Sequence, residues 1–257
     1  MCKKIIIGLL IAGTLTLSLL GCSNKQQSKK DLTISIAASL QKPMEEIKKE
    51  YEDKNKIIIN YNIGGSGTLE KQIVQGANVD VFFSANENYV NELISKDLID
   101  KNEKYNILQN SLVLIKNNKV DKKINELNDL IDSQGKIAIG EVSTVPAGQY
   151  AKETLENLKL WEVLKENLVY AKSVTFVKNY VEKDEADFGF VYKTDAMNIN
   201  DSKIAYEIPN KYHKQITYSL GIIKDSKNQS ESKEFVNYLK STKSKKIFEE
   251  YGFKIGE

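Results

Sequence analysis

The sequence predicts an α/β protein in which parallel sheets are covered by helices on both faces. From Asp31 onward, short apolar runs of strand length alternate with amphipathic helical patterns, and this alternation is typical of parallel α/β sheets. Four of the apolar runs also end in a turn of small residues that leads into a helix. These turns are Ala37-Ala38-Ser39-Leu40, Gly64-Gly65-Ser66-Gly67, Val145-Pro146-Ala147-Gly148 and Ala171-Lys172-Ser173-Val174.

The first half of the chain contains three expected strands and three expected helices. The strands are the apolar runs Leu32–Ala37, Ile57–Ile63 and Val79–Phe83. After each of them, apolar residues recur three or four positions apart, which marks one face of a helix. These positions are Met44, Ile47 and Tyr51 in the first helix, Leu69 and Ile73 in the second, and Val90, Leu93 and Ile94 in the third.

The second half continues the same alternation. A long extended segment begins at Ser111–Ile115, and three further strands are expected at Lys136–Gly140, Phe188–Tyr192 and Ile216–Ile223. Helical spacing of apolar residues predicts three more helical segments. Their stripes are Ala151, Leu155 and Leu158 after the Pro146 turn, then Val174, Val177 and Val181, and finally Phe235, Leu239, Ile247, Phe248 and Tyr251 in the tail Ser232–Tyr251.

Composition excludes several classes of function. The 257 residues carry a net charge of only +2, so no strong field indicates a nucleic-acid partner. Every basic residue is lysine, and arginine is the usual bidentate ligand of carboxylate and phosphate groups. A bound anion must therefore be held by lysines, hydroxyls or the backbone. The single histidine, His213, excludes a multi-histidine metal site, and its polar neighbours predict that it is exposed.

The N-terminus has the pattern of a targeting segment. Lys3 and Lys4 precede the apolar run Ile5–Leu20, and the sequence Leu19-Leu20-Gly21-Cys22 resembles a bacterial lipobox. We therefore expect a lipoprotein signal peptide at 1–21, lipidation of Cys22 and a flexible polar tether at 22–30. The alternative is an uncleaved core helix. The other cysteine, Cys2, lies in the segment that would be removed, so no disulfide is expected.

The small-residue turns predict an anion site. A helix start carries unpaired backbone N–H groups and the positive end of the helix dipole, and ligands of parallel α/β sheets bind beyond the carboxyl ends of the strands. Pro146 suits a first helical position and leaves the donors to the two residues after it, Ala147 and Gly148. Each feature alone also has a structural explanation as a helix cap, a tight turn or a core side chain. The candidate ligand-binding residues are Ser39, Ser66, Ala147, Val174 and Tyr192.

Taken together, the ordered segments resemble the substrate-binding protein of bacterial molybdate ABC importers over residues 32–256. This resemblance implies a two-lobed fold of the type II periplasmic-binding-protein class, with a mostly parallel sheet in each lobe and the ligand cleft between them. Lobe 1 would comprise 31–109 plus 218–257, and lobe 2 would comprise 110–217. The matching stretches are Ile36–Leu40, Gly65–Leu69 with Gln72-Ile73, Val79–Ala85, Asn110–Val113, Val145–Lys152, Phe188–Ala196 and Ile247–Phe253.

The resemblance also assigns roles to the five candidates. The family's oxyanion pocket falls on Ser39 and Ser66 through hydroxyl and backbone N–H, on Ala147 and Val174 through backbone N–H, and on Tyr192 through its hydroxyl. Lobe 1 would bring the two serines and lobe 2 the other three, and closure about a hinge would enclose the ion. One departure is Glu141-Val142, where the family often has Asp-Pro, and it bears on the shape of that loop.

By this resemblance, the protein binds molybdate and tungstate outside the cytoplasm, is anchored by lipid, acts as a monomer and delivers its ligand to an ABC permease. It would be no enzyme and need no cofactor. Since no candidate carries a carboxylate to accept a proton, fully deprotonated oxyanions are favoured over phosphate. The alternatives are a protein that binds sulfate or another oxyanion, a sensor of the same ligand that takes no part in transport, and a hydrolase that uses Ser39 or Ser66, for which His213 is the one histidine base.

Overall fold

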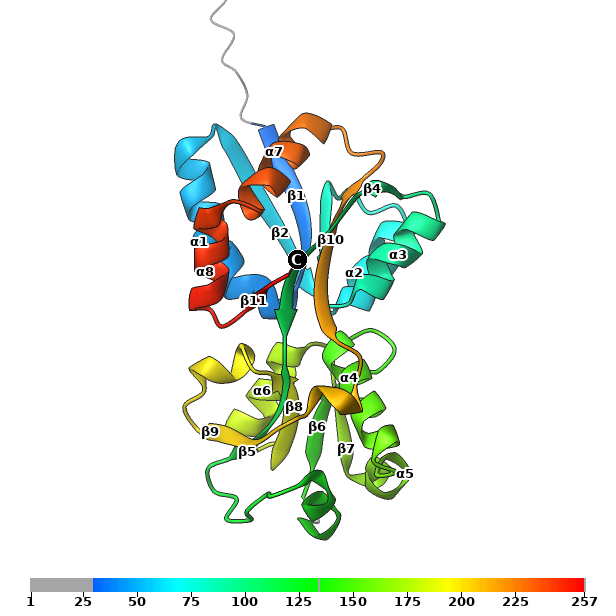
Figure 1. Cartoon of the computed structure of the whole chain (residues 1–257), viewed down its shortest axis with the longest axis vertical. Helices are drawn as coiled ribbons and strands as arrows, with labels where there is room; N and C mark the ends of the chain where they lie inside the picture. Colours follow the sequence, from blue (N-terminus) through cyan, green and yellow to red (C-terminus); the bar gives the residue numbers. More distant parts are fainter. Residues whose placement is uncertain (1–29, 134, 257) are drawn as a thin grey trace, which may run out of the picture.

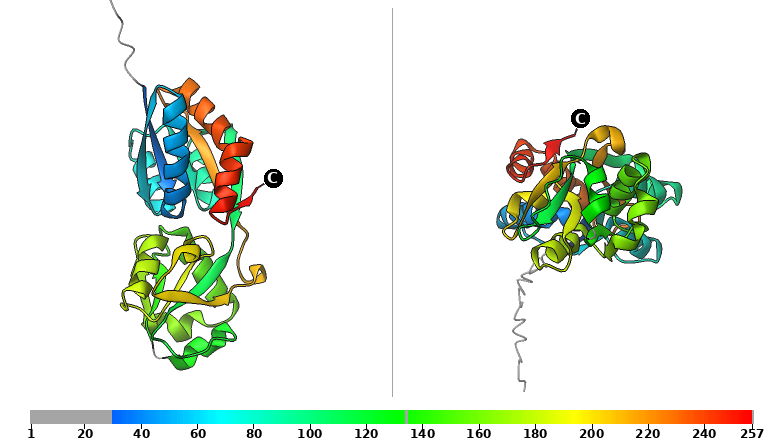
Figure 2. Two further views of the ribbon diagram at one scale, coloured as in Figure 1. Left: turned by 90° about the vertical axis from the view of Figure 1, so that its left-hand side faces the viewer. Right: turned by 90° about the horizontal axis from the view of Figure 1, so that it is seen from below.

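The computed structural model of the chain describes residues 30–133 and 135–256. It consists of two lobes, one above the other in Figure 1, each built on its own sheet. Two extended connections join the lobes, and both run along the same side of the molecule (Figure 2). The expected signal peptide, Cys22 and the tether up to residue 29 lie outside the described residues. In the part of the chain that is described, no helix is long and apolar enough to cross a membrane.

The first lobe contains a six-stranded mixed sheet in the order β11-β4-β10-β3-β1-β2. Strand β1 runs parallel to β2 and β3, whereas β10 is antiparallel to β3 and β4, and β11 is antiparallel to β4. The strands are β1 (Lys30–Ala37), β2 (Ile57–Gly64), β3 (Val81–Ser84), β4 (Ile99–Asn110), β10 (Ile216–Ile223) and β11 (Lys254–Ile255).

Helices cover both faces of this sheet (Figure 1). Helices α1, α7 and α8 pack on one face and α2 and α3 on the other. Successive side chains of β3 point to opposite faces of the sheet, as the two-residue period of a strand requires. Val81 and Phe83 join the core under α1, α7 and α8, and Phe82 joins the core under α2 and α3. The elements are the 3-10 helix η1 (Ala38–Leu40), α1 (Gln41–Lys54), α2 (Ser66–Val74), α3 (Glu87–Ser95), α7 (Gln229–Leu239) and α8 (Thr242–Glu250).

The second lobe contains a five-stranded mixed sheet in the order β7-β6-β8-β5-β9. Strand β6 is parallel to β7 and β8, and β5 is antiparallel to β8 and β9. Its strands are β5 (Leu112–Asn117), β6 (Ile137–Gly140), β7 (Leu168–Ala171), β8 (Phe188–Tyr192) and β9 (Ser202–Glu207). Its helices are α4 (Pro146–Asn157), α5 (Trp161–Leu164) and α6 (Val174–Glu182), with short 3-10 helices at η2 (Leu127–Ser133), η3 (Lys165–Asn167), η4 (Asp195–Asn198) and η5 (Asn210–Tyr212).

The two-lobed α/β architecture is thus confirmed, with three differences of detail. Each sheet is mixed, because the chain passes between the lobes through antiparallel strands. The expected helical tail is two helices: α7 ends at Leu239, and Ser241 caps α8 by accepting from the backbone N–H of Ser244. The second connection enters the first sheet at Ile216, where β10 begins and pairs with Asn110, two residues before the boundary expected at residue 218.

Candidate functional site

A small pocket lies between the lobes, where the starts of several helices meet. The structure brings all five candidate residues to its wall, two from the first lobe and three from the second. Whether they bind a ligand stays a prediction, but their convergence does not depend on the resemblance. The wall is formed by Ala37, Ala38, Ser39, Gly64, Gly65, Ser66, Ala85, Val145, Pro146, Ala147, Ser173, Val174 and Tyr192.

Ser66 is the first residue of α2 and is fully buried. The backbone N–H of Gly67, the second residue of the helix, donates to the carbonyl of Thr144 at 2.9 Å. The donor that the first turn leaves for a ligand is therefore the backbone N–H of Ser66. The Ser66 Oγ accepts from the backbone N–H of Ala85 at 3.1 Å. Because this bond uses a lone pair, the hydroxyl proton of Ser66 is available to a ligand in the cavity.

Ala147 is the second residue of α4, directly after Pro146. Its N–H has no partner within the helix, and the methyl side chain is fully buried. The expectation that Gly148 is a second free donor is wrong, because its N–H donates to the carbonyl of Val145 at 2.9 Å. Helix α4 therefore offers the cavity the N–H of Ala147.

Val174 is the first residue of α6 and is buried against the cavity. The preceding residue, Ser173, caps the helix, since its Oγ accepts from the N–H of Phe176. This cap satisfies the third donor of the turn and leaves the N–H of Val174 without a partner in the helix. The three helix starts thus each direct one unpaired amide toward the same space.

Tyr192 ends strand β8 and is only 1% exposed. In the described part of the chain, its hydroxyl has no hydrogen-bond partner, and buried tyrosine hydroxyls usually have one. Burial raises the pKa of Tyr192 well above its ordinary value, so the hydroxyl stays protonated and remains a donor. Ser39, in η1, completes the set: its Oγ lies 2.8 Å from the hydroxyl of Tyr218.

The lobes also contact one another directly beside the cavity. Gln149, on α4, accepts at Oε1 from the Nδ2 of Asn86 at 3.0 Å and donates through Nε2 to the hydroxyl of Tyr89. Asn86 and Tyr89 belong to the first lobe. The sequence offered no signal for this interlobe contact, because the partners are 60 and 63 positions apart.

The sequence matches the family of bacterial extracellular solute-binding proteins over residues 32–254. The chain belongs to this family.

Named relatives of this solute-binding protein confirm the resemblance noted from its sequence. It is 44% identical to a protein of Bacillus subtilis that is provisionally named ABC transporter substrate-binding lipoprotein YvgL, with 91% of this chain and 92% of that protein covered. It is 36% identical to the molybdate-binding protein ModA of Haemophilus influenzae, with 97% of both covered. Among solved structures, the substrate-binding domain of a provisionally assigned molybdenum ABC transporter from Clostridium difficile is 39% identical, with a TM-score of 0.68 and coverage of 89% of this chain and all of that one.

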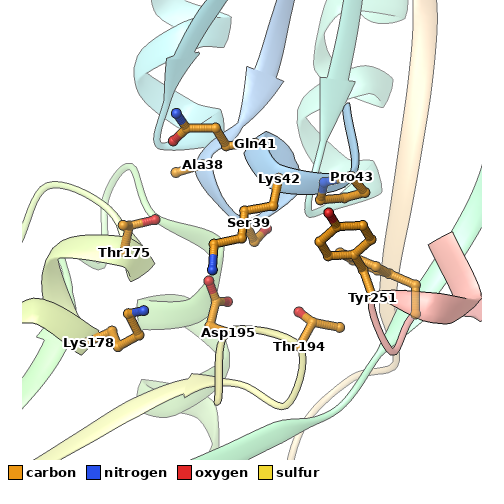
Figure 3. A pocket seen from close by; sticks show the side chains of 11 residues that line it. Ala38, Ser39, Gln41, Lys42, Pro43, Thr175, Lys178, Thr194, Asp195 and Tyr251 are labelled. Atoms are coloured by element: carbon orange, nitrogen blue, oxygen red, sulfur yellow. The ribbon is translucent and has the colours of Figure 1, made fainter. Parts of the chain in front are cut away.

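The five candidate residues carry no charge, and charged side chains line a neighbouring cavity that Ser39 also borders. There, Lys42 of α1 and Asp195 of η4 point toward one another across the lobes, and Lys178 of α6 lies beside them (Figure 3). Burial raises the pKa of Asp195 to about 7, so this carboxyl is largely neutral below pH 7. Within residues 30–133 and 135–256, no group of three or more His, Cys, Asp or Glu could hold a metal ion.

The expectation that His213 is exposed is wrong. The ring is 5% exposed and packs edge-on against Tyr150, because η5 brings the polar stretch against α4. Its Nδ1 lies 2.7 Å from the carbonyl of Lys214, and the ring does not line the cavity. The hydroxyls of Ser39 and Ser66 contact Tyr218 and Ala85 instead, so neither serine is paired with a histidine base as a hydrolase would require.

Proposed function

We propose that this solute-binding protein binds molybdate, and tungstate as its close chemical analogue, outside the cytoplasmic membrane and delivers the ion to an ABC permease. The observation that carries the proposal is the Tyr192 hydroxyl. It is a buried donor with no partner in residues 30–133 and 135–256, and it lies at the wall of a cavity that the starts of three helices also line. The names of the relatives agree with this ligand.

The chemistry of the wall suits a small dianion. Each hydrogen bond to a charged group contributes about 1.5–3 kcal/mol, and each helix start adds about 0.3–1 kcal/mol. Several such donors offset the loss of hydration without a cationic side chain, which agrees with a chain that contains no arginine. The donors come from both lobes, so the ion would hold the lobes together and closure would expel water around it.

Delivery to the permease would depend on membrane anchoring through the N-terminal segment. Lipidation of Cys22 would keep a monomeric binding protein at the outer face of the membrane, close to its transporter. A single acyl chain binds membranes only marginally, so a lipoprotein anchor with more than one chain is expected. If Cys22 is the anchor, the Cys22→Ser variant leaves the membrane fraction and appears in the soluble extracytoplasmic fraction.

Titration calorimetry of the purified protein tests the ligand. We expect tight binding of molybdate and tungstate, weaker binding of sulfate and the weakest binding of phosphate. At a ligand concentration about a hundred times Kd, molybdate should add roughly 2.7 kcal/mol to the free energy of unfolding. A preference for sulfate would reassign the ligand within the same architecture, and a preference for phosphate would contradict the argument from donors alone.

A further inference from the structure

We propose that Asn110 and Tyr218 fix the direction of the Ser39 hydroxyl, so that Ser39 can only donate to a bound anion and protonated oxyanions are rejected. Neither residue lines the cavity, and both act through Ser39, as positioning residues. This inference rests on the proposed function, since it names the device by which that site would select its ligand.

The amide of Asn110 has one orientation. Its Oδ1 accepts from the backbone N–H of Ser111 at 2.9 Å, and an amide nitrogen could not accept there. The Nδ2 group therefore faces the other way and donates its two protons, one to the Oγ1 of Thr194 at 2.9 Å and one to the hydroxyl of Tyr218 at 3.3 Å.

The donation from Asn110 determines where the Tyr218 proton goes. Tyr218 is fully buried, and burial raises its pKa well above the ordinary value, so the phenol keeps its proton. Of its two hydrogen-bond partners, the Nδ2 of Asn110 carries only donors. The proton must therefore be given to the other partner, the Oγ of Ser39, at 2.8 Å.

Ser39 can then act toward a ligand only as a hydrogen-bond donor. Its oxygen accepts from Tyr218, so its own proton is turned away from Tyr218 and toward the cavity that Ser39 lines. An anion oxygen can accept this proton, whereas a P–OH group would meet a second donor. The sequence of donations from Asn110 to Tyr218 to Ser39 also polarises each hydroxyl, which strengthens the last bond.

The hydrogen-bonded series Asn110–Tyr218–Ser39, called the relay below, lies at the junction of the lobes. Asn110 ends β4 and Tyr218 lies on β10, the two strands that lead into the two connections, while Thr194 follows β8 in the second lobe. Asn110 thus contacts both lobes at once. The direction of Ser39 is set where the lobes meet.

The decisive variant is Asn110→Asp, which keeps the shape and reverses the hydrogen bonds. The carboxylate still accepts from Ser111, but it now also accepts from Tyr218. The phenol oxygen becomes the acceptor for Ser39, and Ser39 presents a lone pair to the ligand. At pH 8, sulfate and hydrogen phosphate both carry two negative charges, and only hydrogen phosphate carries a proton. The ratio of their Kd values therefore isolates the proton and cancels the added charge of the aspartate.

We expect the ratio of the phosphate Kd to the sulfate Kd to fall about tenfold in Asn110→Asp, which corresponds to one hydrogen bond gained by phosphate. Tyr218→Phe supplies a second test. Without the phenol the Ser39 hydroxyl rotates freely, so the ratio should fall by a smaller factor and molybdate should bind several-fold more weakly. Tyr61→Phe is the matched control, because its hydroxyl donates to the carbonyl of Met44 and does not line the cavity; its ratio should equal that of the wild type.

The outcomes separate the two proposals. If the wild type fails to bind molybdate, the proposed function is wrong. If the wild type binds molybdate but folded Tyr218→Phe and Asn110→Asp keep its phosphate-to-sulfate ratio, the relay is wrong and these residues serve stability alone. Should Asn110→Asp fail to fold, as judged from its thermal unfolding, the ratio measured for Tyr218→Phe decides.

Discussion

The backbone N–H of Gly67 in the first lobe donates to the carbonyl of Thr144 in the second lobe at 2.9 Å. The lobes therefore meet main chain to main chain at one edge of the cavity. Gly65 makes this approach possible, because a Cβ on it would lie 2.9 Å from the same carbonyl oxygen of Thr144, a distance that real Cβ atoms rarely adopt.

The first prediction is that Gly65→Ala prevents full closure. The backbone of Gly65 is extended, with φ −67° and ψ 134°, so alanine is tolerated locally and the free energy of unfolding should hardly change. The added methyl group, however, separates the lobes, and molybdate affinity should fall about tenfold or more. Small-angle scattering with molybdate should show a larger radius of gyration than for the wild type.

Gly64→Ala is the control for this variant. A Cβ at Gly64 would meet only the side chain of Leu69, at 3.4 Å, within its own lobe. Both glycines line the cavity, so equal affinity losses in Gly64→Ala and Gly65→Ala would show that lost space in the cavity, and not steric contact across the lobes, is the cause.

The second prediction concerns Tyr192→Phe, which should separate stability from binding. Its hydroxyl is buried without a partner among the described residues, so removing it relieves an unsatisfied group, and the ligand-free protein should be as stable as the wild type or about 1 kcal/mol more stable. Molybdate affinity should nevertheless fall by about 1.5–3 kcal/mol, the contribution of one bond to a charged ligand. Thermal unfolding and calorimetry measure the two effects on the same sample.

Tyr61→Phe should behave in the opposite manner. The Tyr61 hydroxyl donates to the carbonyl of Met44 at 2.8 Å, so its loss should destabilise the protein by about 1 kcal/mol and leave binding unchanged. If Tyr192→Phe instead lowers stability and leaves affinity intact, Tyr192 is a core residue and no ligand-binding group.

The third prediction is a pH dependence due to Asp195. Burial raises its pKa to about 7, whereas an unfolded chain releases this proton near pH 4. Between these values the native state binds more protons than the unfolded state, so this carboxyl makes the free energy of unfolding fall as pH rises from about 4 to 7. Asp195→Asn removes that decrease and should be more stable than the wild type by on the order of 2 kcal/mol at pH 8, with a smaller difference at pH 5.

Anion binding should follow the same titration. Asp195 lines a cavity that it shares with Ser39, and its ionised form would repel a dianion, although Lys42 and Lys178 weaken this effect. The wild type should therefore bind molybdate more tightly at pH 6 than at pH 8, and Asp195→Asn should bind equally at both. A wild-type affinity that rises with pH would contradict the assignment.

Most of the fold could be predicted because buried apolar residues recur with the period of their element. Strand β4, at Ile99–Asn110, could not, since most of its residues are polar and many are exposed, as expected of a strand that passes from the first sheet to the junction of the lobes. Strand β9, at Ser202–Glu207, forms the edge of its sheet and shows the same mixed pattern.

The candidate site could be predicted in part for a related reason. Helix starts after strands are local signals, so Ser66, Ala147 and Val174 could be found from the sequence. The contact of Asn110 with Tyr218 joins residues 108 positions apart, and no local pattern reports such a pairing. The polar neighbours of His213 in the sequence wrongly predicted an exposed ring, because a helix from another part of the chain covers it.

The fourth prediction is that Gln149 acts as a clamp between the lobes. It bonds to Asn86 and Tyr89 across the junction, and under the proposed function these bonds would stabilise the closed form that holds the ion. Gln149→Leu should weaken molybdate binding about five- to a hundredfold, because it removes two neutral hydrogen bonds that contribute about 0.5–1.5 kcal/mol each, and the change should lie mainly in a faster dissociation rate. Stopped-flow fluorescence measures both rates.

A double-mutant cycle with Tyr89→Phe identifies the contact responsible. If Gln149 acts partly through Tyr89, the double variant should lose less affinity than the sum of the two single losses. Gln75→Leu is the matched control, since Gln75 is exposed at the end of α2 and does not line the cavity; it should bind as the wild type does. Strict additivity of Gln149→Leu and Tyr89→Phe, or an unchanged dissociation rate, would mean that the bond between them does not hold the lobes closed.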